Sequence, residues 1–150
     1  MAEARQATLA TALARDDSGR PYASLVLVAP AVDGSPILLL SDLADHSRNL
    51  KRDARAALLF DGTAGLDDPL TGPRVSVLGQ VRPVPGRADA ARLKAIFLAR
   101  HPGAAVYADF TDFRVYRMAV ESAHYVAGFG QIHWLSAAEI RAATGPGPEA

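Results

Sequence analysis

Residues 41–60 read SDLADHSRNLKRDARAALLF and join two apolar runs in the first half of the chain. The run at residues 36–41 leads into a polar turn, and the run at residues 55–60 follows a short polar segment. This order predicts a strand, a short helix over residues 45–53 and a further strand. The turn and the first helical turn are rich in groups that bind anions, which a simple connection between strands does not require.

The start of the predicted helix has the features of a phosphate site. We take Asp45 as the N-cap, so that His46, Ser47 and Arg48 form the first turn. Backbone N–H groups there lack intrahelical acceptors, and the positive end of the helix dipole lies at this end. The Ser47 hydroxyl and the Arg48 guanidinium add donors that suit phosphate oxygens. Taken alone, however, the spacing favours an ordinary solvent-facing helix start, because Asp, Ser and Asn are common there as capping residues.

The rest of the chain predicts short strands in hairpin-like succession. Leu9 and Leu13, four apart in an alanine-rich segment, predict an amphipathic helix over residues 3–15. Two apolar runs joined by an Asp-Gly loop predict a β-hairpin of residues 22–29 and 36–41. Further predicted elements are strands at residues 55–60, 74–84, 110–126 and 131–135, helices at 88–100 and after a capping box of Ser136 and Glu139, and a loose tail at 145–150.

About six strands with a few short helices predict a mainly β fold, in which an antiparallel barrel carries attached helices. No domain boundary is visible, so we expect a single domain over residues 1–150. The apolar strands at residues 22–29 and 36–41 show little polar alternation and indicate burial on both faces, as in a barrel wall covered by a partner. We therefore predict a homodimer.

Composition excludes several classes of protein. Acidic and basic residues balance at 16 each, so neither a general nucleic-acid binder nor a nucleic-acid partner is expected. The chain has no cysteine, which excludes disulfides, thiolate metal sites and a cysteine nucleophile. No histidine pair has the helical spacing of a zinc site, and no metal site is predicted. Without a signal peptide or an apolar run near the roughly 20 residues that span a bilayer, we expect a soluble cytoplasmic protein without a membrane partner.

Three stretches of the chain, taken in order, resemble the pyridoxamine 5′-phosphate oxidase-like, FMN-binding split-barrel superfamily. They are LSDLADHSRNL at the predicted helix start, GPRVSVLGQV in the alternating strand, and DFRVYRM followed by GFGQIHWL. The resemblance covers roughly residues 19–136 and is strongest to the haem-utilisation (HugZ-like) branch. It implies a split β-barrel homodimer with FMN in a groove at the subunit interface, formed by residues of both chains.

The resemblance also implies which residues hold the cofactor. Residues of the strand-to-helix turn are expected at the FMN phosphate: Ser41, His46, Ser47, Arg48 and Asn49. A strand is expected beside the isoalloxazine edge, mostly through its backbone groups: Tyr22, Ala23, Ser24 and Leu25. Side chains of the other subunit are expected to cover the ring or to reach its polar edge: Gln80, Gln131 and Trp134. Considered without the resemblance, Trp134 also fits an anchor in the core or at the dimer interface.

Departures from the superfamily pattern leave the function open. His46 stands where a Lys is expected, and Asp45 adds a negative charge to the phosphate turn. His124 and His133 lie on either side of the GFG sequence at residues 128–130. They are candidate haem or metal ligands if the fold brings them together. The ordinary interpretation is that both are surface or interface histidines whose hydrogen bonds are satisfied. The leading interpretation is an FMN-dependent oxidoreductase with an unassigned small-molecule substrate and no assigned catalytic residue. A haem-handling protein and a cofactor-free regulatory dimer are the alternatives.

Overall fold

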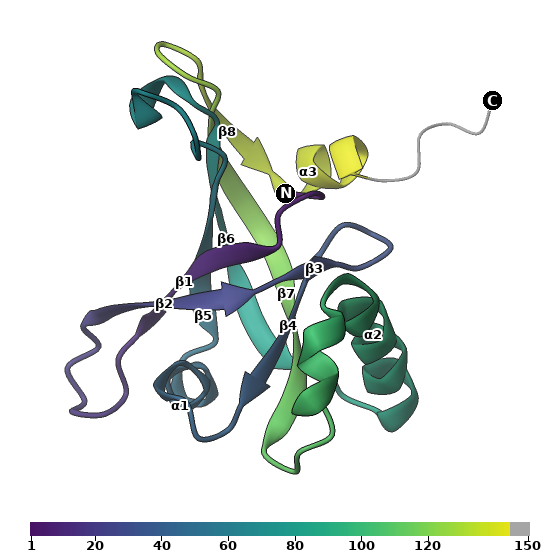
Figure 1. The fold of residues 1–150 in the computed structure, drawn as a ribbon. Helices are drawn as coiled ribbons and strands as arrows, with labels where there is room; N and C mark the ends of the chain where they lie inside the picture. The colour runs from purple at the N-terminus through teal and green to yellow at the C-terminus, as the bar shows by residue number, and fades with distance from the viewer. Residues whose placement is uncertain (145–150) are drawn as a thin grey trace.

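The computed structural model describes residues 1–144, which form one curled antiparallel sheet with three helices around it (Figure 1). The strand order is β2-β1-β5-β6-β7-β4-β3, and β8 pairs with β7. The strands are β1 (Gln6–Ala12), β2 (Pro21–Leu27), β3 (Ala29–Pro30), β4 (Pro36–Ser41), β5 (Arg55–Asp61), β6 (Arg74–Pro83), β7 (Phe113–Val126) and β8 (Ile132–Ser136). The helices are α1 (Asp45–Arg52), α2 (Arg87–Arg100) and α3 (Ala137–Thr144), with 3₁₀ turns at Pro69–Thr71 and Pro102–Val106. The predicted mainly β fold with attached helices is confirmed.

Two apolar clusters lie on opposite faces of β4. Leu38 and Leu40 belong to the cluster inside the curled sheet. Ile37 and Leu39 belong to a second cluster, which includes Phe97 of α2. Figure 1 shows α2 beside β4. The strand is therefore buried on both faces, as its sequence predicted, but α2 of the same chain covers the second face. The apolarity of β4 consequently gives no support for a partner subunit.

The predicted helix over residues 3–15 is wrong, because this segment forms strand β1. Ala7, Leu9 and Thr11 alternate inward and are buried. The strand pairs with β2 on one side and with β5 on the other, so the sheet satisfies its backbone groups from both sides. This central position outweighs the helix propensity of the alanines, since strand preference depends mainly on packing against neighbours.

The predicted hairpin of residues 22–29 with 36–41 is also wrong in its pairing. β2 pairs with β1 along its whole length, while β4 pairs with β7 and with the two-residue strand β3. The chain turns between β1 and β2 at Asp17 and Gly19, which have φ values of 59° and 63°. Gly adopts this left-handed region without a steric cost, and Asp adopts it at a small cost. The segment DDSG is therefore suited to a turn.

The elements of the second half agree with the sequence predictions apart from small shifts at their ends. The capping box is confirmed, since the Ser136 N–H donates to Glu139 Oε2 at 2.7 Å and the Glu139 N–H donates to Ser136 Oγ at 3.3 Å. The predicted tail at residues 145–150 lies outside the described residues. Within the described part of the chain, the helices are all too short or too polar to cross a bilayer.

Gly79 lies at the register shift between β6 and β7. A Cβ atom at this position would overlap the backbone carbonyl oxygen of Ala119 on β7. We expect Gly79→Ala to lower the free energy of unfolding in urea by about 2 kcal/mol or more, because the paired backbones must separate locally. Gly103→Ala is the matched control, since a Cβ there meets open space. Equal losses in the two variants would contradict the close approach of β6 and β7.

Candidate functional site

The start of α1 borders a groove of about 490 Å³ beside the turn that joins β1 to β2. Arg15 of the turn and Arg48 of the helix line this groove together with Asp45. Arg48 Nη1 lies 3.5 Å from Asp45 Oδ1, and both side chains are largely exposed. Solvent screens such a pair, so the guanidinium groups stay available to an anion in the groove.

Asp45 is not the N-cap of α1, so that prediction is wrong. Ala44 holds the cap position, and no side chain caps the helix. The N–H groups of Ser47 and Arg48 both point to the Ala44 carbonyl oxygen, at 3.1 and 3.3 Å. The first helical position instead carries the Asp45 carboxylate, which is favourable for the helix dipole but competes with an incoming anion.

Ser47 and Asn49 lie on the buried side of α1. The Ser47 side chain is 0% exposed, and its hydroxyl has no hydrogen-bond partner among residues 1–144. Asn49 Nδ2 donates to Thr11 Oγ1 at 3.0 Å, and Asn49 Oδ1 accepts from the Ala14 N–H at 2.8 Å. Asn49 therefore fastens α1 to the end of β1, a structural role that the sequence did not indicate.

His46 and Ser41 flank the turn before α1. His46 Nδ1 lies 3.2 Å from Ser24 Oγ on β2. Burial lowers the pKa of His46 and the charge of Asp45 opposes this, so the imidazole is mainly neutral near pH 7 and adds no cation to the groove. Ser41 Oγ donates to Asp112 Oδ2 at 2.5 Å and accepts from the Leu43 N–H at 3.1 Å. The Ser41 hydroxyl thus stabilises the turn itself.

A row of outward-facing side chains crosses six strands of the sheet. Strand register places these six residues side by side, and we call them the outer row: Leu25, Thr8, Leu59, Ser76, His124 and Trp134. Leu25 is 69% exposed, Leu59 41% and Trp134 63%. The rings of His124 and Trp134 contact each other, with centroids 4.7 Å apart. Exposed apolar side chains aligned in this way mark a contact surface.

His124 and His133 do not come together. In the β7–β8 ribbon, His124 pairs with Trp134, and His133 pairs with the next residue, Tyr125. Successive residues of a strand point to opposite faces, so the two imidazoles lie on opposite sides of the ribbon. In the part of the chain that is described, no group of three or more His, Asp or Glu side chains could hold a metal ion.

The other predicted cofactor residues are dispersed over the sheet. Tyr22 is half-buried and Ala23 is exposed on β2. Gln80 Nε2 donates to Glu121 Oε1 at 2.8 Å, and the exposed Gln131 closes the turn before β8 through its backbone. Trp134 is too exposed for a core anchor, so its role as an interface anchor remains a prediction. The structure therefore brings Ser24 and the α1 residues together in one chain, whereas the predicted contacts of the second subunit stay predictions.

Arg15 is a candidate binding residue that the sequence analysis missed. The sequence predicts a helix over residues 3–15 that ends at Arg15, whereas the structure places Arg15 in the β1–β2 turn. The turn residues Asp17 to Gly19 were a signal for a hairpin. A hairpin predicted at this turn places Arg15 at the end of a strand, at the same end of the barrel as the α1 turn.

The chain belongs to the CREG β-barrel family, whose model matches residues 1–141. It is 36% identical over 110 residues to the non-canonical chloroplastic haem oxygenase HOZ of Arabidopsis thaliana. The aligned region covers 73% of this chain and 33% of that protein. It is also similar to a haem-binding protein from Mycobacterium smegmatis, with 31% identity, a TM-score of 0.83 and coverage of 92% of this chain and 55% of the other. This chain therefore spans about a third and about half of the lengths of these two relatives.

A third similarity concerns the fold alone. A Clostridium acetobutylicum protein of the pyridoxinephosphate oxidase family superposes with a TM-score of 0.65 at 14% identity, over 91% of this chain and 89% of the other. This similarity confirms the predicted split-barrel fold, which the chain shares with that protein.

The contacts of Asn49 predict a difference between neighbouring residues of α1. Asn49→Ala leaves the Thr11 hydroxyl and the Ala14 N–H without partners in a buried region, so we expect the free energy of unfolding to fall by about 2–4 kcal/mol. Arg48→Ala removes only an exposed ion pair and should cost less than about 0.5 kcal/mol. Denaturant melts of the two variants measure both values, and similar losses would show that Asn49 does not fasten α1.

Proposed function

We propose that this protein binds haem on the outer row, between two copies of the chain, with His124 as the side chain that would hold the haem iron. The observation that carries the proposal is the position of His124 beside the exposed Trp134, in an outward-facing row that also carries the exposed Leu25 and Leu59. Haem iron takes a histidine nitrogen as a ligand, and the flat porphyrin needs apolar walls. Both requirements are present on one face of the sheet.

Similar proteins support haem as the ligand. The relatives at 36% and 31% identity are a haem oxygenase and a haem-binding protein by name. Since the chain spans only part of each, their whole activity does not transfer to it. Bound haem would supply any redox chemistry, while the residues of this chain would hold the ring, orient it and exclude water.

A second copy of the chain completes the proposed site. Leu25 and Leu59 of the outer row are exposed to solvent in one chain. A porphyrin has two faces, and a single outer row covers one of them. Two outer rows that face each other would supply both walls and would hide the exposed apolar side chains. A stable interface of this kind buries about 1,200–2,000 Å² in total. The homodimer is therefore part of the proposal, and light scattering at micromolar concentration should give the mass of two chains.

Haem titration with two histidine variants tests the proposed ligand. The wild-type protein should give a saturable shift of the Soret band. His124→Ala should weaken binding by about tenfold or more, because the iron loses its ligand. His133→Ala is the matched control, since His133 lies on the opposite face of the same ribbon. No spectral change in the wild type, or equal effects of the two substitutions, would reject haem binding through His124.

FMN is the second candidate ligand, and the groove at the start of α1 favours it. Two guanidinium groups, of Arg15 and Arg48, line this groove next to the first turn of the helix, where a phosphate would find further N–H donors. Ser47 and Asn49 contribute little to such a site through their side chains, since both are buried. An FMN-dependent oxidoreductase would use this groove for the phosphate of its cofactor.

Fluorescence titration with FMN tests this second candidate. Arg48→Ala and Arg15→Ala should each weaken FMN binding by about tenfold, because each removes a charged donor to phosphate. Lys51→Ala is the control, since Lys51 lies a turn further along α1, paired with Asp42 at 3.2 Å. Equal effects of all three substitutions would show that the groove is an ordinary helix start and not a phosphate site. Failure to bind either FMN or haem would leave the cofactor-free dimer as the explanation.

A further inference from the structure

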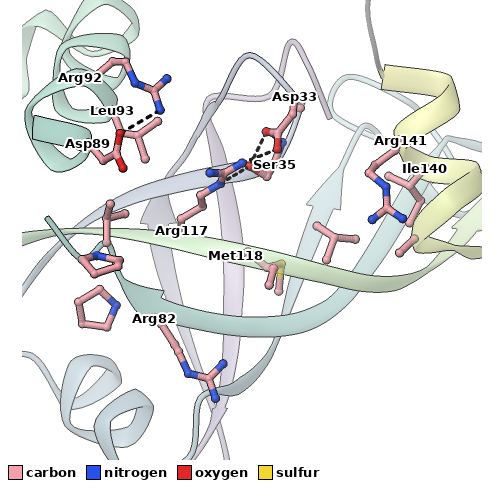
Figure 2. Close-up of a pocket in the computed structure, with 17 residues that line it drawn as sticks. Asp33, Ser35, Arg82, Asp89, Arg92, Leu93, Arg117, Met118, Ile140 and Arg141 are labelled. Atoms are coloured by element: carbon pink, nitrogen blue, oxygen red, sulfur yellow. Dashed lines mark hydrogen bonds and ion pairs between the residues drawn. The ribbon is translucent and has the colours of Figure 1, made fainter.

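A cavity of about 520 Å³ lies between the β3–β4 hairpin, the β6–β7 ribbon and the first turns of α2 and α3 (Figure 2). Its lining contains no residue of the outer row and no residue of the groove at α1. It is therefore separate from both candidate cofactor sites within one chain. Its volume lies in the range of small-molecule sites, which measure about 300–1,000 Å³.

The base of the cavity is apolar. Met118 and Ile140 belong to the cluster inside the curled sheet, and Leu93 belongs to the cluster between β4 and α2. The cavity thus lies at the junction of the two apolar clusters of the molecule. Figure 2 shows Met118 at its centre, with Ile140 descending from α3 on one side and Leu93 projecting from α2 on the other. These three side chains are themselves buried, so they form the floor beneath the cavity, and an apolar ligand group would lie over them.

The rim of the cavity carries more positive than negative charge. Arg117 donates from Nε to Ser35 Oγ at 2.7 Å and also pairs with Asp33, and Arg92 lies 3.6 Å from Asp89. These two arginines are therefore held by carboxylates of the cavity itself, as the dashed lines in Figure 2 show.

Two further arginines of the rim have no such partner. Arg82 and Arg141 line the cavity but form no ion pair and no side-chain hydrogen bond within residues 1–144. Arg82 lies opposite Arg117 in the β6–β7 register, and Figure 2 shows the two side chains pointing apart, Arg117 toward Ser35 and Asp33. Asp33 neutralises Arg117, which leaves the positive charge of Arg82 and Arg141 uncompensated at the rim.

We propose that this cavity binds a small organic anion with an apolar body, namely a monocarboxylate, whose apolar part covers Met118 and whose carboxylate meets Arg141. A guanidinium group matches a carboxylate with two parallel hydrogen bonds. The apolar base disfavours ions with a polar body, such as sugar phosphates, because their hydroxyl groups would lose water without gaining partners. This ligand is additional to the proposed haem and does not depend on it.

Met118 allows a direct test in the intact chain. The protein has two methionines, Met1 and Met118, and Met1 does not line the cavity. Protein labelled with ¹³C-methyl methionine should therefore give two methyl signals. On titration with 1-naphthoate, the Met118 signal should shift saturably through the ring current of the ligand, while the Met1 signal stays in place. The neutral analogue 1-naphthalenemethanol should bind about tenfold more weakly, because it cannot pair with a guanidinium group.

Substitutions at the rim separate charge recognition from general apolar binding. Arg141→Gln should weaken naphthoate binding by about fivefold or more, and Arg141→Lys should restore part of it, because the charge returns without the fork. Arg82→Gln serves as a second variant if Arg141→Gln fails to fold. Arg20→Gln is the matched control, since Arg20 is exposed in the β1–β2 turn and lies outside the cavity lining.

Four results would overturn the proposal. They are an unchanged Met118 signal, equal binding of acid and alcohol, equal effects of Arg141→Gln and Arg20→Gln, and displacement of naphthoate by haem. The last result would make the cavity part of the haem site instead of a separate one. A haem titration that fails while naphthoate binds would reject the proposed function and leave this inference standing.

Discussion

The pairing of β1 with β2 on one side and with β5 on the other is the constraint on which both candidate cofactor sites depend. On the outer face it aligns Thr8 between Leu25 and Leu59, which makes the outer row continuous. On the inner face it presents Thr11 to Asn49, which holds α1 against the barrel. At its end the same strand leads into the turn that carries Arg15. A register slip of one residue would exchange the two faces and disrupt all three features.

The polar stretch at residues 41–60 combines two different functions along one short helix. Ser47 and Asn49 face inward, where they are buried and serve the packing of α1. Asp45 and Arg48 face the groove and are the residues that a ligand would meet. Asn49 follows Asp45 by four residues and shares a side of the helix with it, but the Asn49 side chain is bonded to Thr11 and Ala14, so the two residues have unlike roles. The density of polar groups therefore overstates the size of the candidate phosphate site.

The sequence predicted the fold class and the elements α1, β6, α2 and β7, and it predicted β6 and the capping box most directly, because β6 alternates with period two and Ser136 and Glu139 form a specific cap. It failed at β1, where alanines spaced as in a helix lie in the middle of a sheet, since partner strands distant in sequence determine that structure. It predicted β2 as a strand but gave it the wrong partner, because pairing with β1 or with β4 satisfies the same apolar pattern. Arg15 and the separation of His124 from His133 depend on register, which a single sequence does not specify.

Haem binding through His124 unites the exposed apolar row, the need for a second copy and the similarity to haem proteins. The most direct measurement is the absorption spectrum of the haem complex of His124→Ala, recorded before and after the addition of imidazole. If His124 holds the haem, the substitution should shift the Soret band away from its wild-type position, and free imidazole, which supplies the missing nitrogen ligand, should shift it back. A variant whose haem spectrum matches that of the wild type without imidazole would contradict the assignment.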